Sequence, residues 1–282
     1  MSRRLLRLLA VVFSLTLLMS ACGGDDDGDS VESGSGSGSG SRSSEAADLG
    51  LVDDGKLTVC SDIPYAPFEF EDGGDLKGID VDLMKAMAKE LDLEADFRDT
   101  DFDGIFASLA AGNCDVIASS VSITDERKKN NEFTDGYFEI NQSLLVRKGE
   151  ESTLNDLAAL KGKTVGVQSE TTGAAYAEAN AKANGYSVKE FTGADELFTA
   201  LKAKQVDAVL QDFPINSYNA ETTGDTVVSK VFEEDEKEEY GFVVKKGNTA
   251  LVEALNAALK SLRDSGTYDE ILEEYLGESA TS

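Results

Sequence analysis

Two stretches of the chain alternate short β-rich runs with helical runs, in the same order and at similar spacing. In the first stretch the pattern predicts strands at 57–62, 94–99 and 114–120, separated by helices at 82–93 and 102–112. In the second it predicts strands at 163–168, 186–191 and 206–212, separated by helices at 172–185 and 195–204. Such alternation is typical of parallel sheets covered by helices, so we expect an α/β fold built from two βαβαβ units.

The two units also match residue by residue. When 102–120 is set over 194–212, at a constant offset of 92, the apolar positions stay in phase and several pairs are identical. These pairs include Asp103 with Asp195, Phe106 with Phe198, Leu109 with Leu201, and Asp115 with Asp207. The correspondence indicates two lobes of similar structure.

Polar residues follow the predicted strands of both units. Asp62 and Gln168 end the two opening strands, while Ser120 and Asp212 end the third strand of each unit. Ligands of open parallel sheets bind beyond the carboxyl ends of the strands, so we expect these side chains to converge on one crevice between the lobes.

The segment SSVSITDER, residues 119–127, gathers hydroxyl groups in front of a single arginine. Thr124 is placed to cap a short helix with Asp125 and Glu126 in its first turn, which would direct Arg127. A guanidinium offers a planar fork that matches a carboxylate. An isolated arginine is usually a solvated surface charge, so this assignment depends on the surrounding motif.

Composition excludes several classes of function. The chain has no His and no Trp, which removes His-dependent catalytic triads and imidazole metal sites. An enzyme is therefore disfavoured, and we expect neither a metal nor a cofactor. The formal net charge of −28 makes nucleic acid and anionic lipid headgroups poor partners.

The N-terminus is typical of an exported protein. Residues 1–21 combine three arginines with an apolar run and a small-residue end, which predicts a signal peptide. The sequence MSAC resembles a bacterial lipobox, which implies a lipidated Cys22 that anchors the protein to the outer face of the cytoplasmic membrane; a simple signal peptide with an incidental Cys is the alternative. Residues 22–50 are a Gly/Ser and acidic tether with an expected span of about 30 Å.

Two further cysteines leave a question open. An exported protein favours a disulfide between Cys60 and Cys114. The predicted strands place these residues at opposite ends of neighbouring strands, beyond the roughly 7 Å Cα separation that a bridge allows. The sequence does not decide between a disulfide and two thiols.

Ordered motifs in both units resemble a known family. The motifs GIDVDLMKAMAKEL, DVIASSVSITDERKKNNEFTDGYF, KGKTVGVQSETTG, VDAVLQD and YGFVVKKGN are similar to those of polar amino-acid-binding proteins of bacterial ABC importers, from Lys56 to Gly277. The resemblance implies a two-lobed periplasmic-binding-protein fold of type 2, each lobe a βαβαβ-based sheet flanked by helices. It implies a first lobe of 51–139 plus 247–282 and a second of 140–246, joined by two hinge strands near 140–147 and 240–246.

The same resemblance implies a role for each residue of a ligand site. Arg127 would pair with a ligand α-carboxylate, aided by the hydroxyl and backbone groups of Ser120 and Ser122 and by the N–H of Thr172. Asp212 would bind the α-ammonium, although capping of the following helix is an alternative role for it. The ligand side chain would meet Tyr65, Phe102, Gln168 and Asp62.

The residues around Asp62 imply a ligand class. With no basic residue evident beside Asp62, a basic or amide side chain fits and an acidic one is repelled. Glu170 departs from the Gly that relatives usually have in QSETTG. Its side chain would alter the loop, add a second acid or face solvent, and we favour solvent.

The resemblance implies a monomeric receptor that captures an L-amino acid by hinge closure and delivers it to an ABC permease driven by an ATPase subunit. Two alternatives share the scaffold. One is an enzyme similar to cyclohexadienyl dehydratase, with Glu170 or Asp212 as general acid, and the other is a ligand sensor without transport.

Overall fold

A computed structural model describes residues 49–277 except 234 and 236. These residues belong to one compact unit, Ala46–Ser282. The predicted signal peptide, Cys22 and nearly all of the tether lie outside the described residues. None of the helices within the described part of the chain is long and apolar enough to cross a membrane.

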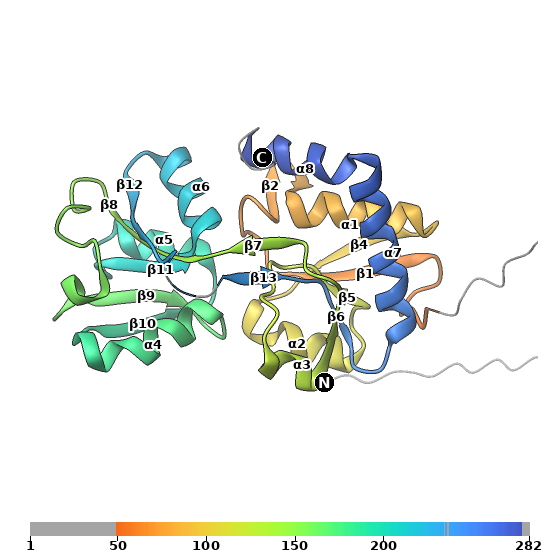
Figure 1. Cartoon of the computed structure of the whole chain (residues 1–282), viewed down its shortest axis with the longest axis horizontal. Helices are drawn as coiled ribbons and strands as arrows, with labels where there is room; N and C mark the ends of the chain where they lie inside the picture. Colours follow the sequence, from red (N-terminus) through yellow and green to blue (C-terminus); the bar gives the residue numbers. More distant parts are fainter. Residues whose placement is uncertain (1–48, 234, 236, 278–282) are drawn as a thin grey trace, which may run out of the picture. The chain divides into compact units, whose positions relative to one another are not determined.

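Two five-stranded sheets organise the protein (Figure 1). The first has the order β4-β1-β5-β14-β6, with β1 at Lys56–Ser61, β4 at Glu94–Asp99, β5 at Val116–Ile117, β6 at Asn131–Phe133 and β14 at Val243–Lys245. The second has the order β10-β9-β11-β8-β12, with β8 at Gln142–Arg147, β9 at Thr164–Gln168, β10 at Ser187–Phe191, β11 at Ala208–Asp212 and β12 at Thr226–Val231. We call each sheet with its packed helices a lobe, the first and the second.

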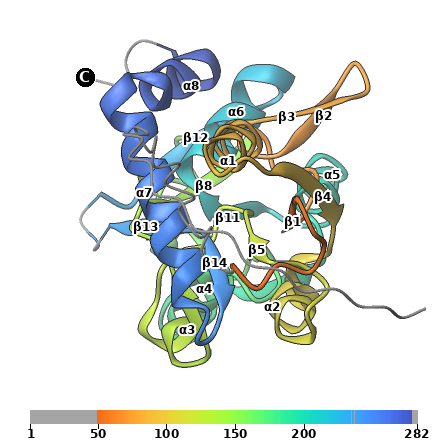
Figure 2. The ribbon, with the colours of Figure 1, turned by 90° about the vertical axis from the view of Figure 1, so that its right-hand side faces the viewer.

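Helices cover both sheets. The first lobe carries α1 (Ile79–Glu90), α2 (Phe102–Ala111), α3 (Asp125–Asn130), α7 (Thr249–Ser265) and α8 (Thr267–Leu276). The second carries η1 (Leu157–Leu160), α4 (Thr172–Asn184), α5 (Ala194–Lys202) and α6 (Phe213–Thr223). Helices α7 and α8 come last in the chain but pack on α1, and both ribbon views place them over the first sheet (Figure 1, Figure 2).

The predicted duplication is confirmed. In each lobe the three strands of the βαβαβ unit are parallel, with the opening strand at the centre of the trio. The matched aspartates make the same contacts, because Asp115 accepts the Thr58 N–H at 2.8 Å and Asp207 accepts the Thr164 N–H at 2.9 Å. Each of these bonds ties the start of a third strand to the opening strand of its own unit.

Two short strands run between the lobes. Strand β7 (Phe138–Ile140) pairs antiparallel with β13 (Glu238–Tyr240). This pair lies slightly before the expected hinge ranges, because β8 at 142–147 already belongs to the second sheet and β14 at 243–245 to the first. The chain thus enters the second lobe along β7 and returns along β13 (Figure 1).

Each lobe has its own apolar core. Buried side chains of β1, α1 and α7, such as Leu57, Met84 and Leu255, form one cluster in the first lobe. Leu144, Val165 and Leu210 form a corresponding cluster in the second. Burial of one such side chain contributes about 2 kcal/mol. The first cluster also contains Ala194 and Ile215 of the second lobe, so part of the apolar core lies between the lobes.

Some element boundaries differ from the predicted ones. Helix α1 begins at Ile79 and not at 82, because Asp80 and Asp82 both lie in its first turn, where acidic residues favour the helix dipole. Gly112 ends α2 in the left-handed conformation, as predicted. The hairpin of β2 (Phe70–Asp72) and β3 (Asp75–Lys77) was not predicted.

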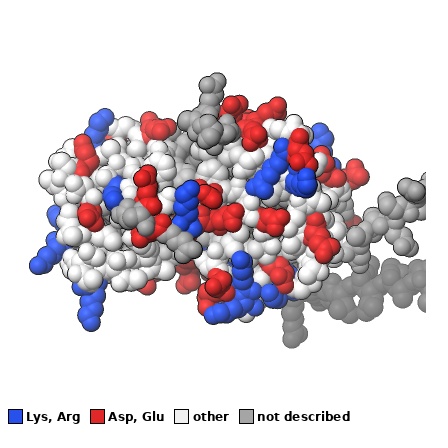
Figure 3. All heavy atoms as spheres, viewed as in Figure 1, with Lys and Arg blue, Asp and Glu red and all other residues white. Residues whose placement is uncertain are grey.

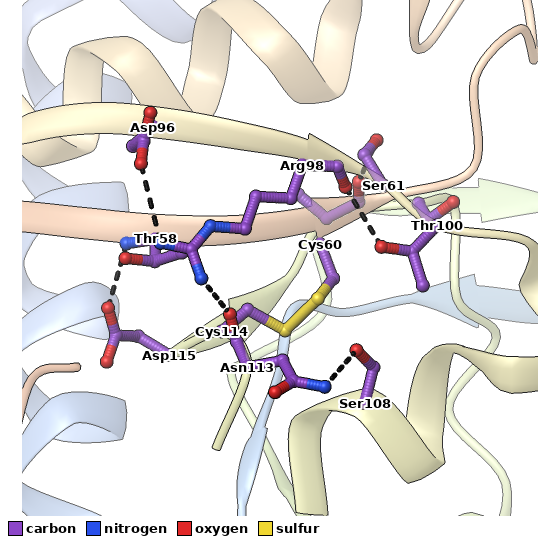
Figure 4. The surroundings of a disulfide bond; sticks show 12 residues. Thr58, Cys60, Ser61, Asp96, Arg98, Thr100, Ser108, Asn113, Cys114 and Asp115 are labelled. Atoms are coloured by element: carbon purple, nitrogen blue, oxygen red, sulfur yellow. Dashed lines mark hydrogen bonds and ion pairs between the residues drawn. A yellow bond between two sulfur atoms is a disulfide. The ribbon is translucent and has the colours of Figure 1, made fainter. Parts of the chain in front are cut away.

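Cys60 and Cys114 form a disulfide, with their Cα atoms 5.8 Å apart (Figure 4). The expectation that they lie beyond bridging distance was wrong. Strand β5 contains only Val116 and Ile117, so Cys114 lies in the turn between α2 and β5 and not in an extended strand.

On the face drawn in Figure 3, acidic side chains are spread over both lobes and basic side chains lie among them. This distribution agrees with the strongly negative charge of the chain.

Gly78 allows the loop before α1 to approach closely. Its φ of 129° and ψ of 168° are nearly exclusive to glycine, and a Cβ there would lie 2.0 Å from the Phe68 carbonyl oxygen. We predict that Gly78→Ala lowers the free energy of unfolding by about 3 kcal/mol or more, measured by urea denaturation. Gly74→Ala is the control, because it also has a positive φ but no atom within 4 Å, and we expect a cost of about 1 kcal/mol. Equal losses in the two variants would contradict the close approach.

Candidate functional site

One cavity of about 290 Å³ lies where the carboxyl ends of strands from both lobes meet. The side chains that line it are Asp62, Tyr65, Phe102, Ser119, Ser120, Ser122, Arg127, Gln168, Thr171, Thr172 and Asp212. The structure therefore brings together all nine residues predicted for the ligand site and adds Ser119 and Thr171.

Hydrogen bonds across the cavity join the lobes. Asp62, after β1, accepts from the Gln168 amide at the end of β9 at 2.6 Å. Tyr65 donates its hydroxyl to Asp212 at 3.1 Å. Both carboxylates thus have a polar neighbour supplied by the opposite lobe.

Asp62 is a buried carboxyl group with acidic neighbours. Burial, reinforced by the negative charges of Asp101, Asp99 and Asp195 and opposed by the bond from Gln168, raises its pKa to about 7. This part of the cavity has a strongly negative potential, so a cation placed there would hold Asp62 in its ionised form.

Asp212 lies at the junction of β11 and α6. It precedes the helix, but its side chain makes no capping bond, so the alternative role as a helix cap is not realised. Its Oδ1 accepts from the Gln142 amide at 2.6 Å, and its Oδ2 accepts from the hydroxyls of Tyr65 and Tyr240. Burial and then the charge of Glu238 raise the pKa of Asp212 to about 6, so the group is ionised at neutral pH.

The predicted cap and arginine are in place. Thr124 accepts from the Arg127 N–H at the start of α3. The guanidinium lies about 5.5 Å from the ring centres of Phe102 and Phe106, and donates to the carbonyls of Ser122 at 2.9 Å and Glu170 at 3.0 Å. Burial lowers the Arg127 pKa, but an arginine remains charged at any physiological pH. Two of its five N–H groups are used in these bonds, so others are left to meet an anion.

The serine segment has fewer donors than expected. Ser120 has a left-handed backbone with φ of 51°, and its N–H donates to Asp80 at 2.8 Å. Its backbone donor is therefore not available, while its hydroxyl is buried in the cavity and makes no hydrogen bond within the described chain. Ser122 lies 3.5 Å from the hydroxyl of Thr172, the first residue of α4, where helix N–H groups point outward.

Two fully buried carboxyl groups, those of Glu69 and Asp80, accept hydrogen bonds from the serine segment. Glu69 accepts from the Ser119 hydroxyl at 2.9 Å, and its other oxygen has no hydrogen-bond partner among the described residues. Asp80 accepts from the Ser120 N–H and the Tyr137 hydroxyl. Burial and the charge of Asp80 raise the Glu69 pKa well above its usual range, and burial raises that of Asp80 to about 7. This pair retains a proton near neutral pH.

Glu170 faces solvent, as favoured from the sequence. Its φ of 61° is one that glycine adopts readily, which agrees with the Gly expected at this position in relatives. Its carbonyl reaches Arg127 across the cavity, so the backbone of this loop takes part in the site although the side chain does not.

Several residues around the cavity were not predicted. Gln142 and Tyr240 hold Asp212, and Glu238 touches Gln142, but all three lie in or beside the strands that connect the lobes. Glu69 and Asp80 have no sequence signal either, because their burial and pairing appear only when distant segments meet. Ser119 could have been predicted as a site residue, since it lies next to Ser120 at the end of the same strand.

The lining of the cavity has charges complementary to those of a small dipolar molecule. Arg127 is the single cation among its lining residues, and it shares the cavity with two carboxylates and five hydroxyl-bearing Ser and Thr side chains. Among the described residues no group of His, Cys, Asp and Glu is arranged to hold a metal ion. The charges suit an anion at Arg127, and cations at Asp212 and Asp62.

Comparisons with a protein family and with individual proteins both indicate a solute-binding protein. Residues 57–278 match the bacterial extracellular solute-binding proteins, family 3. A probable histidine-binding protein of Neisseria gonorrhoeae is 33% identical over 262 residues, which cover 92% of this chain and 91% of that protein.

Solved structures show the same fold. An ancestral arginine-binding protein bound to glutamine superposes with a TM-score of 0.74 and 39% identity, over 80% of this chain and 100% of that one. The ancestral amino acid-binding protein AncCDT-1, a precursor of cyclohexadienyl dehydratase, has a TM-score of 0.73 and 33% identity, over 78% of this chain and 95% of that one. The fold is thus the predicted two-lobed, type 2 periplasmic-binding-protein fold, and the curated relatives are binding proteins and not enzymes.

We predict that the buried carboxyl pair makes stability depend on pH. The folded protein holds a proton that the unfolded chain releases, so the free energy of unfolding should fall as pH rises from about 4.5 to 7, by up to about 1.4 kcal/mol per pH unit. The amide of Glu69→Gln is a hydrogen-bond donor at every pH and does not titrate. The free energy of unfolding of this variant, relative to that of the wild type, should therefore increase as pH rises across this range. Urea denaturation at several pH values measures the difference.

Glu71→Gln is the matched control, because Glu71 is exposed on the neighbouring strand β2. Its stability should follow the wild type at every pH. If Glu69→Gln also ran parallel to the wild type, the pair would not share a proton in the folded state.

Proposed function

The chain belongs to family 3 of the bacterial extracellular solute-binding proteins, and from this membership we propose that it captures an L-amino acid with a cationic side chain. The observation that carries the proposal is the charge pattern of the cavity, in which one guanidinium and two buried carboxylates line a space of about 290 Å³. A basic amino acid at neutral pH carries the complementary set of one carboxylate and two cations.

Arg127 is the proposed seat of the ligand carboxylate. It is the one basic residue in the cavity lining, and Ser120 adds a buried hydroxyl without another partner within the described residues. The N-terminus of α4 at Thr172 contributes N–H groups from the second lobe.

Asp212 is the proposed partner of the α-ammonium, and Asp62 that of the side-chain cation. Tyr65 and Phe102 flank the path between them and are nearly fully buried, as suits contact with an alkyl stem. The acidic surroundings of Asp62 favour a cation over a neutral amide, since burial leaves its charge without a counterion unless the ligand supplies one. The histidine-binding relative supports this class, whereas the arginine-binding relative was solved with glutamine bound.

Closure of the two lobes about β7 and β13 is the proposed mode of capture. Both lobes contribute residues to the site, so the charges would be buried only when the lobes meet, and the ligand would then provide the missing partners. The closed protein would deliver its ligand to an ABC permease driven by an ATPase subunit. Lipidation at Cys22 would anchor it to the outer face of the cytoplasmic membrane.

We predict that Arg127→Ala weakens binding of every L-amino acid ligand by about 100-fold or more, because it removes a charge-assisted, two-bond contact to the shared carboxylate. Arg127→Lys should recover only part of this loss, since an ammonium cannot form the fork. Isothermal titration with L-arginine, L-lysine, L-histidine and L-glutamine provides the measurement.

Lys128→Ala is the control for this charge change, because Lys128 is exposed in the same short helix. It should bind like the wild type. Normal binding by Arg127→Ala would show that the carboxylate seat is elsewhere.

We predict that Asp62→Asn changes ligand preference more than it removes binding. Affinity for L-arginine should fall about tenfold or more, whereas that for L-glutamine should change little, because only the cationic ligand loses a charge partner. The same titrations, with Asp103→Asn on the exposed side of α2 as control, measure the ratio. An unchanged ratio would remove Asp62 from the side-chain site.

A further inference from the structure

A third carboxylate lies behind the proposed ammonium partner. Glu238 is the first residue of β13, one of the two strands that connect the lobes, and it is half buried. Its Oε1 accepts from the Gln142 amide at 2.9 Å. Its Oε2 is buried and has no hydrogen-bond partner among the residues that the structure describes.

The Gln142 amide connects this group to Asp212. The same nitrogen lies 2.6 Å from Asp212 Oδ1 and 2.9 Å from Glu238 Oε1, so the two oxygens are no more than 5.5 Å apart, the sum of those distances. Two carboxylates at this separation repel each other, and one amide cannot neutralise either charge. They therefore form a site where a cation is favoured.

Glu238 also acts on Arg127. Among the charges that affect the Arg127 pKa it has the largest influence, ahead of Asp212 and Glu170. The strand brings it there, because β13 pairs with the serine segment through the bond from the Ile123 N–H to the Glu239 carbonyl and that from the Gly241 N–H to the Val121 carbonyl. Glu238 is thus close to both proposed seats of the amino-acid backbone.

We propose that Glu238 is a further ligand-binding residue of this site, supplying with Asp212 a two-carboxylate seat for the α-ammonium group of the ligand. The proposal rests on the proposed capture of an L-amino acid. The seat combines Glu238 of the connecting strand β13, Gln142 of β8 and Asp212 of β11. A charged ligand bound there would therefore act on the strands about which the lobes are proposed to close.

The experiment compares Glu238→Gln with Glu239→Gln, the neighbouring exposed residue on the same strand. Titration with L-arginine and with L-glutamine at pH 7.5 should show about tenfold weaker binding of both by Glu238→Gln, because both probes carry the α-ammonium. Glu239→Gln should match the wild type. Glu238→Asp, which keeps the charge, should fall between them and serves if the Gln variant does not fold.

A pH profile separates this role from a structural one. The groups that face Asp212 are Glu238 and Tyr240 from β13, Gln142 from β8, Tyr65 from the loop after β1, and Arg127 from α3. Protonation of Asp212 removes its charge, so wild-type affinity should fall as pH is lowered through about 6. Without Glu238 the repulsion that raises the Asp212 pKa is gone, and the fall should move to lower pH. Asp62 titrates in the wild type and in every variant, so its effect on affinity is common to all of them and does not contribute to the difference between their pH profiles.

The outcomes are distinct. Weaker binding at pH 7.5 together with a midpoint moved to lower pH supports the two-carboxylate seat. If the wild type binds the probes and Glu238→Gln matches Glu239→Gln within twofold with the same midpoint, Glu238 has no role in binding the ammonium group. If the wild type binds neither L-arginine nor L-glutamine, the proposed function fails, and the ammonium seat fails with it.

Discussion

The structure depends on burying acidic groups with almost no opposite charge beside them. Asp62 and Asp212 line the cavity, where Arg127 is the one cation among the lining residues, and Glu69 and Asp80 are fully buried beside the serine segment. Burial raises the pKa of each of these carboxyl groups, because hydrogen bonds from neutral donors satisfy many of their oxygen atoms without cancelling a charge. The lobes therefore meet around acidic groups that a bound cation would stabilise in their ionised form.

The duplicated scaffold explains how this arrangement is built. Both lobes use the same parallel trio of strands, with Asp115 and Asp207 in the same structural role. The lobes differ at the carboxyl ends of the strands, where the first presents a serine segment and an arginine, and the second presents Gln168 and Asp212. A repeated frame thus places different chemistry on the two walls of one cavity, with the guanidinium of Arg127 on one side and the carboxylate of Asp212 on the other.

The strands that connect the lobes, β7 and β13, also place side chains beside the cavity. Strand β13 pairs with β7, binds the serine segment through backbone hydrogen bonds, and carries Tyr240 and Glu238 toward Asp212. Any rotation of one lobe against the other must move these groups relative to the cavity. The proposed ligand binding and lobe closure would therefore be mechanically linked through the same few residues.

The sequence by itself determined the α/β class, the duplication, the helix cap at Thr124 and the nine residues that meet in the cavity. These features follow from local periodicity, from capping chemistry and from ordered motifs, all of which can be read along the chain. The sequence also placed Gly112 at the end of a helix and Glu170 where relatives usually have Gly, because glycine commonly occupies positions with a positive φ.

Only the tertiary structure decided how the groups are partnered. The disulfide between Cys60 and Cys114 depends on a turn that replaces the expected strand, and the Ser120 N–H turned out to be used by Asp80. Glu69, Asp80, Gln142 and Glu238 are unremarkable in the sequence, since a carboxyl or amide side chain gains its importance from burial and neighbours. Those neighbours come from segments tens to hundreds of residues apart, and their contacts exist only after the lobes and connecting strands have assembled.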